Sequence, residues 1–127
     1  MRTGLFIAVV TLLLLGIHAA GYIWSLYFTT NWYDAPAHFL GGVWVAALLL
    51  HFFKIKTVPL ILIVFTVGVL WELFELSVNG LGVFAYRIPF RYDVVDTLMD
   101  LLMDTLGAAL IALGTIRTRL PRQRKAR

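Results

Sequence analysis

The segment Asp96–Ile116, "DTLMDLLMDTLGAALIALGTI", decides the class of this protein, because it is apolar enough to cross a bilayer and yet begins with aspartates. A transmembrane helix needs about 20 mainly apolar residues. A charged side chain near the centre of such a helix costs at least ~2.5–3.5 kcal/mol. Asp96, Asp100 and Asp104 recur at intervals of four, so they share one stripe of a helix. That stripe must face protein rather than lipid, and we therefore expect other membrane helices around it.

The composition of the whole chain agrees with a membrane protein. Of its 127 residues, 61% are hydrophobic and 14% are charged, whereas a soluble domain is about 45–50% apolar and about 25% charged. The length allows one domain. Because the chain has no cysteine, a disulfide framework, a thiolate metal site and a cysteine nucleophile are excluded.

Four apolar stretches predict an all-α integral membrane bundle of four transmembrane helices, at about residues 5–28, 36–53, 58–76 and 96–116. Residues 1–116 then form a single domain in the cell membrane, followed by a basic cytoplasmic tail at 117–127. The basic start and small residues of 1–21 are also found in cleaved signal peptides. The apolar run continues to Phe28, which favours a retained helix.

The basic residues predict that both termini lie in the cytoplasm. Nine of the eleven are on the side of the termini: Arg2, Lys54, Lys56 and six in the tail. Arg87 and Arg91 are on the other side, and such an asymmetry marks the cytoplasmic face. The tail directly follows an apolar segment, as a contact with anionic lipids would. It has no aromatic–basic interleaving, so no nucleic-acid partner is expected.

In this topology all seven acidic residues fall on the extracytoplasmic side, where we expect them to line a polar pocket. The candidate metal or pocket residues are Asp34, His38, Glu72, Glu75, Asp96, Asp100 and Asp104, with His18, Arg87 and Arg91 as secondary candidates. Asp96 equally suits an N-terminal helix cap, and His18 alone suits a hydrogen-bonded core histidine. Gly41 and Gly42 are predicted to permit close helix packing.

Three motifs in this order resemble the YjdF-like and VanZ-like families of small polytopic bacterial membrane proteins. They are "YDAPAHFLGG", "WELFEL" and "DTLMDLLMDTLGAAL", and the resemblance covers roughly residues 31–114. The matching positions are Asp34, His38, Phe39, Glu72, Glu75, Asp100, Asp104 and Gly107. VanZ-like sequences usually have a residue other than Glu at position 75 and Asn at position 104, so the acidic version looks closer to the YjdF-like branch. The resemblance implies a cell-envelope role, since VanZ is linked to reduced glycopeptide susceptibility, and it implies no reaction.

Carboxylates with one or two imidazoles suit a divalent cation, namely Mg²⁺, Mn²⁺ or Ca²⁺, with a di-iron centre as the weaker alternative. The first hypothesis is therefore a metal-dependent site acting on a lipid-linked or cell-envelope substrate. Whether it is an enzyme stays open, because Thr97 and Thr105 have no obvious activating base. The alternatives are a non-enzymatic envelope or cation-binding protein and a proton- or cation-coupled transporter. The expected partners are the bilayer and a lipid headgroup or lipid-linked precursor, and the oligomeric state stays open.

Overall fold

The computed structural model describes residues 2–80 and 94–119, and all of its regular structure is helical. The elements are α1 (Arg2–Ile23), α2 (Leu26–Thr29), α3 (Asp34–Phe52), α4 (Thr57–Gly80) and α5 (Val94–Arg119). All except α2 are long and apolar enough to span a membrane, which confirms the predicted all-α bundle of four membrane helices. Their direction across the membrane stays a prediction.

The predicted first span, 5–28, corresponds to two helices rather than one. α1 ends at Ile23, and Ser25 adopts a left-handed backbone conformation with φ 56° just before α2 begins. The Tyr27 ring then packs on Gly21, where a Cβ atom would overlap it. The chain therefore turns back over the end of α1, because this contact replaces the helical continuation that the apolar sequence predicted.

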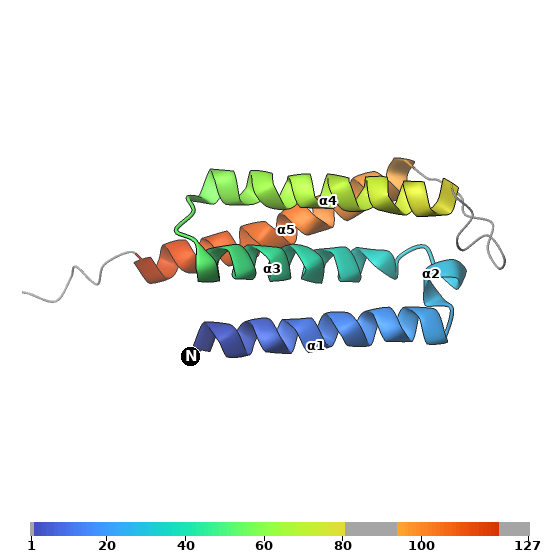
Figure 1. Ribbon diagram of the computed structural model, residues 1–127, viewed down its shortest axis with the longest axis horizontal. Coiled ribbons are helices and arrows are strands. Elements are labelled where there is room, and N and C mark those ends of the chain that lie inside the picture. The colour runs from blue at the N-terminus through green and yellow to red at the C-terminus, as the bar shows by residue number, and fades with distance from the viewer. Residues whose placement is uncertain (1, 81–93, 120–127) are drawn as a thin grey trace, which may run out of the picture.

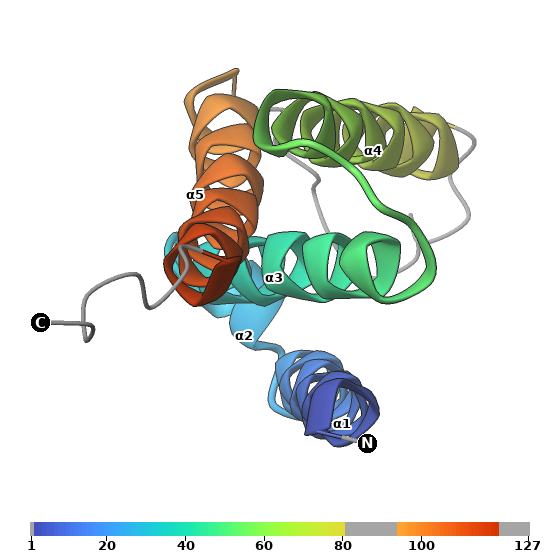
Figure 2. The same cartoon turned by 90° about the vertical axis from the view of Figure 1, so that its left-hand side faces the viewer.

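Helix α3 is the central element of the bundle. In Figures 1 and 2, α1 lies on one side of α3, and α4 and α5 lie on the other. Of the α3 span 33% is buried inside the protein, against 11% of the α1 span. α1 is attached through polar bonds: Trp44 Nε1 donates to Thr11 Oγ1 at 2.7 Å, and the Tyr33 hydroxyl donates to the Ile17 carbonyl at 2.9 Å. Val10 is buried, and much of the remaining α1 surface is exposed and available to lipid.

Helices α3 and α5 approach each other at glycines. A Cβ atom at Gly42 would overlap the backbone carbonyl of Asp104, and one at Gly107 would overlap the carbonyl oxygen of Phe39. Small residues allow helix backbones in a membrane to come this close. The packing role predicted for Gly42 is confirmed, and the contact presses the Asp104 segment of α5 against the first half of α3.

The two ends of the bundle differ in chemistry. The end where α3 and α5 begin and α4 ends, on the right in Figure 1, is called the acidic end here, since Asp34, Glu75 and Asp96 lie there. The opposite half holds a cluster with no polar side chain, each residue at most 1% exposed: Ala46, Leu60, Val64, Ala108 and Ala112. Any site for a charged ligand therefore belongs to the acidic end.

We predict that Gly107→Ala lowers the free energy of unfolding by about 1–3 kcal/mol, the usual cost of overpacking. The added methyl group would meet the α3 backbone, which cannot move aside as a flexible side chain does. Gly114→Ala, on the same helix with nothing within 4 Å of the new atom, is the control. Unfolding in detergent measures both variants, and equal stabilities would contradict the close approach of α3 and α5.

Candidate functional site

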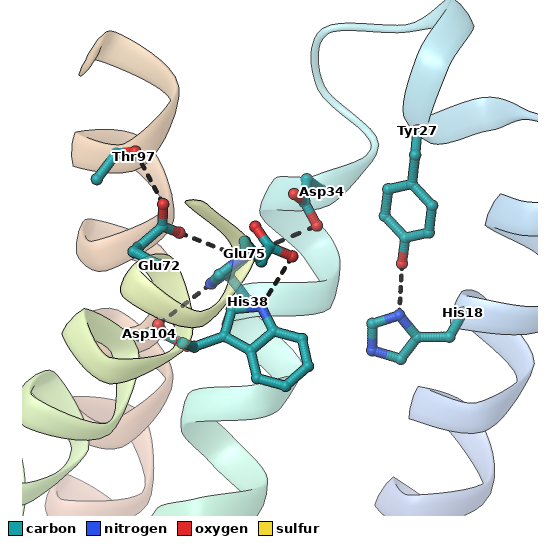
Figure 3. Close-up of polar contacts among 9 residues, drawn as sticks. His18, Tyr27, Asp34, His38, Glu72, Glu75, Thr97 and Asp104 are labelled. Carbon is teal, nitrogen blue, oxygen red and sulfur yellow. Dashed lines mark hydrogen bonds and ion pairs between the residues drawn. The ribbon is translucent and has the colours of Figure 1, made fainter. Parts of the chain in front are cut away.

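His38 is the centre of a polar cluster built from three helices (Figure 3). Its Nδ1 lies 3.2 Å from Asp104 Oδ2 of α5. Its Nε2 lies 3.8 Å from Asp34 Oδ1, one turn earlier on α3, and 3.8 Å from Glu72 Oε1 of α4. The imidazole is 6% exposed, so the protein rather than water surrounds it.

The contact with Asp104 assigns the two nitrogens of His38. A carboxylate can only accept a hydrogen bond, so the shared proton belongs to Nδ1. In the neutral ring the Nε2 lone pair then faces the oxygens of Asp34 and Glu72. A separation of 3.8 Å is too long for a hydrogen bond. Three acceptors that face one another attract only when a proton on one of them or a metal ion lies among them.

Asp34, His38 and Asp100 form a group that can hold a metal ion. Each offers one ligand atom, and these atoms all lie within 4.8 Å of one another. Asp100 is 3% exposed, on the helix face that also carries Asp104. Ligand atoms around a tetrahedral ion with bonds of about 2.1 Å lie ~3.4 Å apart, so modest side-chain rotations bring the three atoms to coordinating distances.

Glu72 lies beside this group with one oxygen engaged and one not. Thr97 Oγ1 of α5 donates to Glu72 Oε2 at 2.8 Å. Glu72 Oε1 is buried, accepts no hydrogen bond and faces His38 Nε2. A buried acceptor without a donor is costly unless a cation compensates it. Glu72 is therefore suited to be an additional ligand.

Three candidate residues lie outside the cluster around His38. Glu75 accepts a hydrogen bond from Trp71 Nε1 of its own helix at 3.0 Å. Asp96 is exposed in the first turn of α5. His18 of α1 pairs through Nδ1 with the Tyr27 hydroxyl at 2.7 Å, as a structural histidine does. Arg87 and Arg91 fall outside the described residues.

The sequence pattern suggested Thr97 only as a nucleophile and not as a partner of a glutamate. In the structure Thr97 donates to Glu72 and thereby orients it. Thr97 stands three residues before Asp100, so helical spacing alone could have predicted that it lies beside the aspartates of α5. Gly68, which lies against the Asp104 carboxylate, was not predicted either. It stands four residues before Glu72, and this spacing places it on the same, inward face of α4.

The pair of His18 and Tyr27 belongs to an aromatic cluster at the C-terminal end of α1. The Tyr27 ring packs edge-on against Tyr33 with centroids 5.2 Å apart, and Tyr22 lies at 5.5 Å. Burial raises the pKa of the Tyr27 phenol above its ordinary value of 10.0, and the Asp34 carboxylate raises it further. Tyr27 therefore keeps its proton and its hydrogen bond to His18 in alkaline solution.

These features together define a small multi-pass α-helical membrane protein with a buried His/Asp cluster. The chain belongs to the family described as "Predicted membrane protein (DUF2238)", whose model matches residues 1–120. No curated protein and no solved structure is significantly similar to it. The family match confirms the predicted membrane localisation, and the resemblance to YjdF-like and VanZ-like proteins stays a prediction.

Tyr27 gives a prediction about pH. A phenol whose pKa is raised by folding stabilises the folded state fully below pH 10.0, its ordinary value, and this contribution is lost as the pH rises through the raised pKa. Ultraviolet titration of tyrosinate should therefore contain a late component. Tyr27→Phe should remove that component, whereas Tyr22→Phe, which changes a ring 59% exposed, should leave it in place. A late component that survives Tyr27→Phe would contradict the assignment of the raised pKa to Tyr27.

Proposed function

We propose that this protein binds a divalent metal ion through Asp34, His38 and Asp100, at the extracytoplasmic end of its membrane bundle. The observation that carries the proposal is the convergence of these three buried or half-buried side chains, with ligand atoms within 4.8 Å of one another. They come from α3 and α5, whose contact at Gly42 fixes their relative position. Glu72 on α4 is the additional ligand.

Charge supports a bound cation. Asp34, Glu72, Asp100 and Asp104 bring four carboxyl groups to a single imidazole within a membrane bundle. Like charges that share a site destabilise one another. A divalent ion relieves this repulsion and occupies the space that His38 Nε2 faces. Among the described residues no lysine or arginine lies within this half of the bundle to do so.

Within residues 2–80 and 94–119, no charged route leads from the site to the other side of the membrane, which favours binding over transport. No Asp, Glu, His, Lys or Arg lies in 39–50 of α3, in 57–71 of α4 or in 105–116 of α5. Those stretches pack into the apolar cluster around Ala46 and Val64. An ion that enters at the acidic end therefore meets a dry barrier.

The depth of the site indicates what a bound ion could act on. Asp100 lies six residues into α5, or ~9 Å along the helix at 1.5 Å per residue. Asp34, His38 and Asp100 alone would leave coordination positions for water or a substrate, as catalytic metal sites do. With Glu72 as a fourth ligand, a six-coordinate ion still keeps two such positions. At this depth the available substrates are the headgroup region of a lipid or of a lipid-linked envelope precursor. Because carboxylates outnumber the charge of one divalent ion, a neutral or cationic group is favoured over a pyrophosphate.

Metal binding is tested by calorimetry on the detergent-purified protein after chelator treatment. We expect saturable binding of Mn²⁺ or another divalent ion near neutral pH. Asp100→Asn and His38→Gln should each weaken it by roughly 10-fold or more, at least the loss seen for partners behind the ligands. Glu75→Gln is the matched control, because that carboxylate is engaged with Trp71.

Two results would reject the proposal. One is no saturable binding of Mg²⁺, Mn²⁺, Ca²⁺, Fe²⁺ or Zn²⁺ by the wild-type protein. The other is a loss of affinity in Glu75→Gln as large as in Asp100→Asn, since the acidic end would then attract cations without the proposed ligands.

The orientation is tested by cysteine labelling, for which a chain with no native cysteine is a clean background. Cysteines replacing Asn31 and Asn79 should react with impermeant reagents from outside intact cells. A cysteine replacing Gln123 should react only after permeabilisation, because the basic tail is expected in the cytoplasm. The reverse labelling pattern would place the metal site on the cytoplasmic side.

A further inference from the structure

Asp104 is enclosed by glycines, and one of them faces the oxygen that contacts His38. A Cβ atom at Gly68 of α4 would lie 2.5 Å from Asp104 Oδ2, too close for the carboxylate to keep its place. A Cβ atom at Gly41 would lie 3.5 Å from Oδ1, an ordinary contact. Gly42 lies directly against the backbone of Asp104.

The Asp104 carboxylate, enclosed in this way, reaches the site through its contact with His38. Asp104 is 7% exposed, and its Oδ2 lies 3.2 Å from His38 Nδ1. Asp104 itself is outside the group of Asp34, His38 and Asp100 whose ligand atoms converge. Its contact instead determines that Nε2 is the nitrogen that faces Asp34 and Glu72.

The orientation of the imidazole bears on which metal the site accepts. Magnesium and calcium take oxygen ligands almost exclusively, whereas zinc, copper, iron and nickel readily accept an imidazole nitrogen. A histidine ligand whose other N–H donates to a carboxylate is more basic and is held in one orientation. With Asp34 and Asp100 alone, the site would offer only oxygen atoms.

We propose that Asp104, seated in the space left by Gly68, is a positioning residue that directs His38 Nε2 into the site and makes the site prefer a transition-metal ion to magnesium or calcium. This inference rests on the proposed function and adds the class of metal and the residues that select it. Gly68 contributes to metal specificity because its lack of a side chain leaves room for the Asp104 carboxylate.

The test compares the affinities for Zn²⁺ and Mg²⁺ of the full-length protein in detergent. The wild type should prefer Zn²⁺. Asp104→Asn should lower this preference by roughly 10- to 100-fold, the usual loss for a carboxylate behind a histidine ligand, with a much smaller change in the Mg²⁺ affinity. Gly68→Ala should act in the same direction without altering any charge. Gly41→Ala, which adds the same methyl group at an ordinary distance, should keep the wild-type preference.

A spectroscopic readout separates positioning from stability. With ¹¹³Cd bound to protein carrying ¹⁵N-labelled histidine, scalar coupling should join the metal to Nε2 of His38 in the wild type. In Asp104→Asn the coupling should weaken or be shared between the two nitrogens. His18 and His51 serve as internal references without coupling.

The outcomes distinguish this inference from the proposed function. A wild-type protein that binds no divalent ion overturns both. If the wild type binds Mg²⁺ as tightly as Zn²⁺, the proposed metal site stands but this inference is overturned. Unchanged zinc preference in both Asp104→Asn and Gly68→Ala, coupling of cadmium to Nδ1, or an equal loss in Gly41→Ala and Gly68→Ala would each overturn it as well.

Discussion

The contact between Gly42 and the backbone of Asp104 is the constraint on which the polar site depends. It brings α3 and α5 close enough for the Asp104 carboxylate to reach the imidazole of His38 at 3.2 Å. A larger residue at position 42 would separate the helices and leave both polar groups buried without partners, at a cost of ~1–3 kcal/mol for each. The close packing at Gly42 therefore determines the geometry of the polar site.

The bilayer explains why the polar groups gather at one end. Carboxylates cannot face lipid, so Asp34, Glu72, Asp100 and Asp104 turn inward around His38. The other half of the bundle is closed by alanine, leucine and valine. Since no cationic side chain of the described residues enters the polar half, the repulsion is relieved by protons on His38 or on the carboxyl groups themselves, or by a bound metal ion.

The sequence predicted the helical class and the residue types of the site, because hydrophobic length and four-residue spacing are local properties. It could not decide which acids meet. Glu72 and Glu75 share a face by spacing, yet Glu72 points to His38 and Glu75 to Trp71. That choice depends on how α4 is rotated about its axis and which helices it crosses. The break at Ser25 likewise depends on the contacts that Tyr27 makes with Gly21 and His18 of α1.

The most direct test of the proposed metal site is a thermal melt of Asp100→Asn in detergent, first with chelator and then with Mn²⁺. Asp100 is 3% exposed among other acids, and Asn keeps its shape while removing the charge. Metal that binds the folded state stabilises it by mass action. If Asp100 is a metal ligand, the variant should melt higher than wild type in chelator and gain less from Mn²⁺. A variant that melts lower in chelator and gains as much from Mn²⁺ would contradict it, and Asp100 would be a structural residue.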